Sequence, residues 1–169
     1  MSGIENISNR EAINKLKQLV EEIDICLFCT NLKKDDGETC RPMSSQKVCE
    51  EGNIWFFSEV GSIKNREIEQ DNQVRLFYSH PGINSYLVVN GEAELVFDRA
   101  IIEELWSPSV KAWFPEGKDD PNISVIKVKP TSGYYWDTKG SKMVNFFRMV
   151  ASAASGKNLI KGNEGTISI

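Results

Sequence analysis

The sequence predicts a mainly β (α+β) fold, in which a small antiparallel barrel of six strands is flanked by helices. Apolar and polar residues alternate over several segments of strand length, and short turns rich in Gly, Asp and Asn join most of them. Segments with helical periodicity do not alternate regularly with these strands, which disfavours a parallel α/β sheet. One long alternating segment has a glycine at its middle, as expected for a strand that bends to close a barrel.

Length and charge limit the classes of function. The 169 residues, 40% of them hydrophobic, suffice for one core, and we expect a barrel domain over residues 1–140 and a helical extension with a tail over 141–169. The net charge of −4 lacks the basic surplus that selects nucleic acid or anionic membranes, so neither is an expected partner. The charged N-terminal segment and the absence of a run of ~18 apolar residues predict a cytoplasmic protein.

The first half of the chain predicts one helix followed by three strands. Ser8 and Glu11 have the spacing of a capping box, and apolar residues then recur at helical intervals, so a helix is expected over residues 9–22. An antiparallel meander follows, with strands over residues 25–32, 39–48 and 53–58 and with turns at 33–37 and 50–52.

The middle of the chain predicts a short helix between two strands, and then a long strand. Residues 62–70 are charged and helical in character with Ile63 and Ile68 as apolar contacts, and residues 74–79 form a strand. After a turn at 81–84, the segment 85–97 is predicted to form a long strand with one apolar face and one mixed face. Gly91 is the expected bend of this strand.

The last third predicts a helix, a loop, a strand and a C-terminal helix. The helix spans 99–106, the loop 108–121 and the strand 123–136, with Ile126 and Val128 facing inward and Lys127 and Lys129 outward. A final amphipathic helix over about 141–156 is expected, and a loose tail after it. The helix is indicated by the helical spacing of five apolar residues: Met143, Phe146, Phe147, Val150 and Ala154.

Cysteine and histidine usage argues against a metal site. The four cysteines, at positions 26, 29, 40 and 49, are expected to be reduced thiols because a chain of this size needs no disulfides. Cys26 and Cys29 lie three apart on a strand and would face opposite ways, so they could not chelate together. His80 is the one histidine, precedes Pro81, and is interpreted as a turn residue.

Two segments could bind a ligand. At the start of the 62–70 helix, free N–H groups, the Ser62 hydroxyl and the Lys64 ammonium suit a phosphate, although Ser62 could equally be a helix cap and Lys64 a solvated lysine. Pro42 interrupts the second strand, where Arg41 could offer donors to a heteroaromatic ring and Met43 a polarizable surface. The alternative is an edge strand with Arg41 in solvent.

In the order in which they occur, several motifs carry a family resemblance over about residues 7–137. They are Arg41-Pro42-Met43, Ile54 to Ser58 with Ser62-Ile63-Lys64, the strand at 74–78, Val89 to Ala93, Trp113 to Gly117, and Tyr135-Trp136-Asp137. The sequence resembles the pyridoxamine 5′-phosphate oxidase-like FMN-binding split barrels, and most closely their general stress protein branch.

The resemblance implies a six-stranded split barrel that binds FMN at the interface of a homodimer. It implies that Ser62 and Lys64 hold the FMN phosphate, that Arg41, Pro42 and Met43 lie along the isoalloxazine, and that Phe57 and Ser58 border the same ring. Trp136 would approach the ring from the partner subunit, with Trp106 and Trp113 as weaker candidates.

Three functions follow as hypotheses. The first is a flavin-dependent oxidoreductase that acts on a small molecule and takes electrons from a donor such as a nicotinamide, with the flavin supplying the chemistry. The second is a non-catalytic flavin-binding stress protein, and the third a dimeric interaction module without flavin. Vitamin B6 oxidation is not expected, because the resemblance to the true oxidases is lost in the C-terminal segment.

Overall fold

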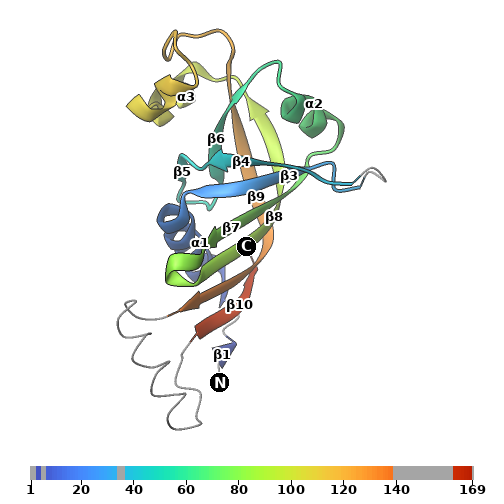
Figure 1. Ribbon diagram of the computed structural model, residues 1–169, viewed down its shortest axis with the longest axis vertical. Helices are drawn as coiled ribbons and strands as arrows, with labels where there is room; N and C mark the ends of the chain where they lie inside the picture. Colours follow the sequence, from blue (N-terminus) through green and yellow to red (C-terminus); the bar gives the residue numbers. More distant parts are fainter. Residues whose placement is uncertain (1–2, 5–6, 34–36, 139–161, 169) are drawn as a thin grey trace.

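The computed structural model describes residues 3–4, 7–33, 37–138 and 162–168. Three α-helices accompany a curled sheet in these residues (Figure 1): α1 (Asn9–Ile23), α2 (Ile63–Gln70) and α3 (Arg99–Leu105). The main strands are β3 (Ile25–Thr30), β4 (Thr39–Ser44), β6 (Ile54–Glu59), β7 (Gln73–His80), β8 (Ser85–Val96), β9 (Ile123–Thr138) and β10 (Gly162–Ser168). The shorter elements are β1 (Gly3–Ile4), β2 (Ile7–Ser8), β5 (Lys47–Val48) and the 3₁₀ turns η1 (Pro81–Ile83) and η2 (Pro108–Ala112).

The sheet is organised around the long strand β9. Its first half pairs with β6, its second half pairs with β10, and β8 runs antiparallel beside it along almost its whole length. The sheet continues from β8 through β7 and β3 to β4, which forms its edge in the described residues. This curled antiparallel sheet confirms the predicted split barrel, and the strands beyond the expected six are β1, β2 and β10 together with the short β5.

Gly91 marks the bend of β8, as predicted. The register of β8 against β9 shifts between Asn90 and Gly91, which is a β-bulge. A Cβ atom at Gly91 would lie 2.7 Å from the carbonyl oxygen of Lys129. Only glycine therefore lets the two backbones approach so closely at this position.

Two apolar clusters fill the fold. The larger lies under α1 and includes Leu16, Phe28, Phe56 and Leu76, all fully buried. The inward side chains of Ile126 and Val128 belong to it, as predicted from the alternation of β9. The smaller cluster lies under α3 and includes Ile102, Phe114 and Val125. Helices α1 and α3 thus each cover one part of the curled sheet.

Several boundaries differ from the prediction. The expected strand over 39–48 is broken into β4 and β5, because Ser45 turns inward and its hydroxyl lies 2.7 Å from the Tyr78 hydroxyl. The expected loose tail is wrong for residues 162–168, which form β10 against β9 with Ile167 buried. The helix predicted over about 141–156 lies outside the described residues.

The cysteine prediction is also wrong for one pair. Cys29 and Cys40 form a disulfide, whereas Cys26 and Cys49 are free. The register of β3 against β4 places Cys29 directly opposite Cys40, with Cα atoms 4.1 Å apart. The register of this hairpin depends on the geometry of its turn, which the cysteine spacing alone did not show. Cys26 faces the core, and burial raises the pKa of its thiol to about 12.

Candidate functional site

The N-terminus of α2 begins at the predicted residue. Ser62 is its cap in extended conformation, and its hydroxyl oxygen accepts a hydrogen bond from the Asn65 N–H at 3.4 Å. The N–H groups of Ile63 and Lys64, which precede Asn65 in the first turn, have no acceptor within the helix, so they can bind an anion. Acidic residues are absent from this turn of α2.

A buried hydrogen-bond network fixes this end of α2 to the sheet. The Ser58 hydroxyl on β6 donates to the Asn65 side-chain oxygen at 2.6 Å, and the Asn65 amide donates to the Ser124 hydroxyl on β9 at 2.9 Å. The Ser124 hydroxyl donates in turn to the Ser58 carbonyl at 3.0 Å. All three side chains are buried, so the position of Ser62 above them is closely defined.

Lys64 is a half-buried cation that lies near both Arg41 and Glu59. Within the described part of the chain it makes no hydrogen bond or ion pair. Burial lowers the pKa of its ammonium group, the nearby Arg41 guanidinium lowers it further, and Glu59 opposes both. Lys64 and Arg41 thus bring two cations close together at this end of α2, and a bound anion would favour the charged form of Lys64.

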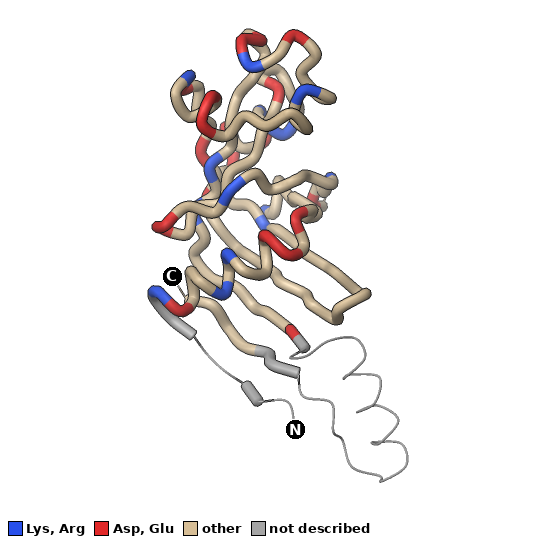
Figure 2. The backbone as a smooth tube through the Cα atoms, turned by 90° about the vertical axis from the view of Figure 1, so that its left-hand side faces the viewer, with Lys and Arg blue, Asp and Glu red and all other residues tan. Residues whose placement is uncertain are grey.

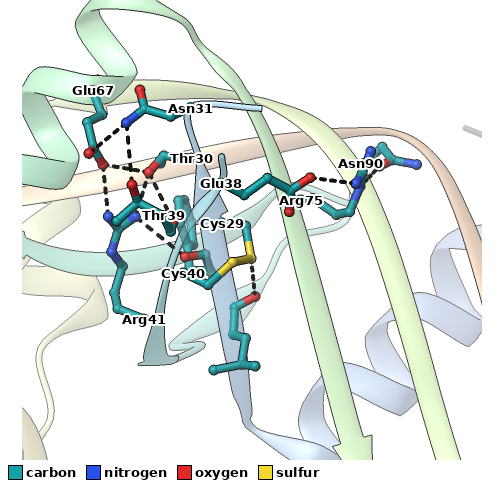
Figure 3. Close-up of a disulfide and its surroundings, with 12 residues drawn as sticks. Cys29, Thr30, Asn31, Glu38, Thr39, Cys40, Arg41, Glu67, Arg75 and Asn90 are labelled. Atoms are coloured by element: carbon teal, nitrogen blue, oxygen red, sulfur yellow. Dashed lines mark hydrogen bonds and ion pairs between the residues drawn. A yellow bond between two sulfur atoms is a disulfide. The ribbon is translucent and has the colours of Figure 1, made fainter. Parts of the chain in front are cut away.

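Arg41 is held by a polar network that ties β4 to α2 (Figure 3). Its guanidinium donates to Glu67 Oε2 at 2.8 Å and to Thr30 Oγ1 at 2.7 Å. Glu67 also accepts hydrogen bonds from the Thr30 hydroxyl at 2.6 Å and the Asn31 amide at 2.8 Å. Burial alone would raise the pKa of Glu67, but the hydrogen bonds from Thr30 and Arg41 prevail and lower it.

Comparison with known proteins identifies the family. A family model described as pyridoxamine 5′-phosphate oxidase like matches residues 11–159. The chain belongs to this family. The family and the resemblance to its general stress protein branch are therefore as predicted.

Individual relatives agree with this assignment. General stress protein 26 of Bacillus subtilis is 31% identical over 70 residues, which cover 40% of this chain and 49% of that protein. The chain spans about half the length of the curated relatives it matches. A crystal structure assigned as general stress protein 26 from Jannaschia sp. superposes with a TM-score of 0.80 at 21% identity, covering 94% of this chain and 99% of that one.

A second crystal structure has the same fold. It is the general stress FMN/FAD binding protein from Xanthomonas citri, with a TM-score of 0.66 at 24% identity. The match covers 79% of this chain and 93% of that chain. These likenesses establish the fold of the pyridoxamine 5′-phosphate oxidase-like chain.

The structure brings some of the predicted site residues together and separates others. Ser58, Ser62, Lys64 and Arg41 lie around the N-terminal half of α2. Pro42 is exposed on the edge strand β4, opposite Leu27, which agrees with its interpretation as an edge residue. Met43 alternates with it and packs partly buried against the main core.

The aromatic candidates lie elsewhere in the chain. Phe57 is on the opposite face of β6 from Ser58 and packs edge-on against Trp106, with ring centroids 6.0 Å apart. Trp113 is 79% exposed after η2. Trp136 lies in the second half of β9, where it pairs with Tyr86 on β8 and with a residue of β10. This end of β9 is the one remote from α2 (Figure 1). One subunit therefore does not place Trp136 beside Ser62 and Lys64.

The outer face of the sheet carries an apolar patch, which we call the sheet-face patch. Its members are exposed side chains on neighbouring strands: Ile25, Leu27, Phe77, Tyr86, Tyr134 and Trp136. Leu27 pairs with Phe77, and Tyr86 with Trp136, so the side chains adjoin across the strands. The region is also tan in Figure 2, and residues 76–91 include no Lys, Arg, Asp or Glu. Exposed apolar faces are typical of interaction surfaces.

Several residues of the site were not predicted. Glu67, Asn65 and Asn31 were overlooked because polar residues on a short charged helix or after a strand are normally solvated. The buried face of α2 comprises Asn65, Glu67 and Ile68, whereas the predicted contact Ile63 is 64% exposed. The spacing of Ser62, Asn65 and Ile68, three residues apart, was the available signal.

No helix in the described residues has the length and apolar character that crossing a membrane requires.

Proposed function

We propose that the protein binds FMN as a homodimer and is a flavin-dependent oxidoreductase that acts on a small molecule in the cytoplasm. The observation that carries this proposal is the pair of neighbouring cations, Lys64 and Arg41, at the capped N-terminus of α2. The Xanthomonas citri relative, which is named an FMN/FAD binding protein, supports a flavin as the ligand.

The residues present fit a flavin phosphate. A phosphate at α2 would accept hydrogen bonds from the first-turn N–H groups, the Ser62 hydroxyl and the Lys64 ammonium, and Arg41 would add a second charge. The anion would relieve the repulsion between the two cations. Ser58 acts through Asn65, since both are buried and hold the helix end in place.

The ring is proposed to lie along the edge strand β4, at Arg41, Pro42 and Met43. An edge strand with a proline leaves unpaired backbone groups on its open side, where a heteroaromatic ring could be hydrogen-bonded. When bound, the flavin supplies the electron-transfer chemistry, and the protein supplies position and access. Phe57, on β6, would contribute indirectly, through its packing against the smaller cluster.

A homodimer explains the sheet-face patch. Burying it against a second copy would remove aromatic and aliphatic side chains from water. The partner's copy of this face would then bring Trp136 toward the ring, which one subunit alone does not do. Sedimentation velocity is expected to give a dimer, and Phe77→Lys a monomer with weakened FMN binding. A wild-type monomer at micromolar concentration would contradict the dimer.

The phosphate site is tested by titrating apoprotein with FMN and following the quenching of flavin fluorescence. Lys64→Ala removes a charge-assisted contact worth about 1.5–3 kcal/mol, so the Kd should rise about 10- to 150-fold. Arg66→Ala is the matched control, because Arg66 is an exposed cation on the same helix. Equal Kd values for wild type and Lys64→Ala would show that the phosphate lies elsewhere.

Turnover distinguishes the two flavin hypotheses. The FMN-loaded dimer is mixed with NADH or NADPH under anaerobic conditions, and the visible spectrum is followed before and after small electrophilic acceptors are added. Bleaching followed by acceptor-dependent reoxidation supports the oxidoreductase. Stable FMN binding without either change would support the non-catalytic flavin-binding protein, and failure to retain FMN would support an interaction module.

A further inference from the structure

The disulfide joins a buried cysteine to an exposed one. Cys29 on β3 is fully buried, whereas Cys40 on β4 is exposed. In the described residues β4 pairs with β3 alone, so the disulfide is a covalent link between the edge strand and the rest of the sheet. Pro42 lacks an N–H donor, which limits the hydrogen bonding of this strand.

Each cysteine is followed by a residue of the Glu67 network. Thr30 follows Cys29, Arg41 follows Cys40, and the Arg41 guanidinium donates to Thr30 Oγ1 at 2.7 Å. Because side chains alternate along a strand, the sulfurs lie on one face of the β3–β4 pair and the Thr30 and Arg41 side chains on the other. Figure 3 shows both groups within one short stretch of the two strands.

The surroundings of the sulfurs are charged. Arg75 lies directly opposite Cys29 in the pairing of β3 with β7, and its guanidinium donates to Glu38 at 2.9 Å. The Glu38 carboxylate lies within 4.8 Å of both sulfur atoms. The Arg75 guanidinium offsets the negative charge that Glu38 brings to the sulfurs, so this carboxylate does not by itself oppose the departure of Cys29 as a thiolate when the disulfide is attacked.

We propose that Cys29 and Cys40 form a reversible thiol–disulfide site whose oxidised form holds Arg41 in place for the flavin phosphate. This inference rests on the proposed FMN binding and adds a redox control to it. With the disulfide closed, β4 is fixed against β3 on both faces. With the disulfide open, β4 keeps its backbone hydrogen bonds, the Arg41 contacts, the Ser44–Asp24 hydrogen bond and the packing of Met43, but it loses its covalent link next to Arg41. Arg41 then samples more positions and binds phosphate less tightly.

The exchange is balanced in atoms and electrons. A cellular dithiol attacks the sulfur of the exposed Cys40, the S–S bond breaks, and Cys29 leaves as a thiolate that takes up a proton. The second thiol of the reductant then displaces Cys40 from the mixed disulfide. The protein gains two electrons and two protons, and the reductant becomes a disulfide. An oxidised dithiol carries out the reverse reaction.

The experiment measures FMN affinity in both redox states of the full chain. Protein is oxidised with glutathione disulfide or reduced with dithiothreitol and desalted without oxygen, and alkylation of the denatured chain should count two thiols in the first sample and four in the second. We expect the Kd for FMN to be at least fivefold higher in the reduced protein. Cys49→Ser should respond like wild type, and the double variant Cys29→Ser/Cys40→Ser should bind weakly in both conditions.

Arg41→Ala tests whether the effect passes through Arg41. In that variant FMN binding is weaker at the start, and reduction should change the Kd by less than twofold, because the contact that the disulfide orders is gone. An unchanged Kd on reduction of the wild type, or four alkylated thiols after oxidation, overturns the redox inference and leaves FMN binding intact. Loss of FMN binding in every state overturns the proposed function as well.

Discussion

Glu67→Gln tests the network that joins α2 to β4. The carboxylate accepts from Thr30 at 2.6 Å, Arg41 at 2.8 Å and Asn31 at 2.8 Å. Glutamine keeps one acceptor oxygen, but its NH₂ group faces donors and the charge opposite Arg41 is lost. A hydrogen bond to a charged group contributes about 1.5–3 kcal/mol, so we expect the free energy of unfolding to fall by roughly 3 kcal/mol when the misplaced donor is included.

The assay is urea unfolding followed by tryptophan fluorescence, with the slope compared between variants. An unchanged slope with a lower midpoint shows a loss of stability without a change in the surface exposed. The control is Glu69→Gln, an exposed carboxylate on the same helix, for which a change within about 0.5 kcal/mol is expected. A loss below 0.5 kcal/mol for Glu67→Gln would refute the view that this carboxylate holds Arg41.

Four further outcomes follow. Because the pKa of Glu67 is lowered from 4.5, its stabilising contribution is present above pH 4.5 and is lost as pH falls through the lower folded value; acid unfolding curves should therefore show a smaller loss below pH 4.5 in Glu67→Gln than in wild type. The pKa of Lys64 is lowered, so as pH rises the lysine loses its charge, and FMN affinity declines, at a lower pH than for an ordinary lysine. Lys64→Arg should remove that decline in a fluorescence titration. Gly91→Ala places a Cβ against the Lys129 carbonyl and should cost about 1–3 kcal/mol in urea unfolding, whereas Gly61→Ala, with open space around it, should cost little; equal losses would contradict the bulge argument. Ile167→Ala should cost about 2–4 kcal/mol and the exposed Ser168→Ala almost nothing, and a neutral Ile167→Ala would mean that β10 does not contribute to the core.

Local patterns were sufficient for most of the fold. The alternation along β8 and β9 gave their inward faces, and Gly91 gave the bend, since both depend on residues close in sequence. The strand ends one residue earlier than predicted, and Phe97, the last residue of the predicted range 85–97, is 56% exposed after it. The Ser62 cap gave the start of α2 for the same local reason.

The parts that were missed depend on contacts between different elements of the fold. The disulfide needs the register of β3 against β4, and the Glu67 network needs α2 to lie beside both strands. β10 alternates only weakly and gains its stability from β9, so its sequence alone suggested a tail. Of the candidate ligand residues, Ser62 and Lys64 could be chosen from the helix start, whereas the proximity of Arg41 to Lys64 required the fold.

The parallel pairing of β1 and β2 with β10 has a consequence for how the chain folds. Gly3 pairs with Asn163 and Ile7 with Ile167, so two short strands close the longest loop that the described residues allow. The entropy cost of such a closure grows with loop length, and few contacts compensate it. During synthesis, residues 3–8 must wait until residues 162–168 have been made, while the β7–β8 hairpin can form from neighbouring residues. We therefore expect this edge to assemble after the hairpin and to exchange its amide protons with solvent sooner.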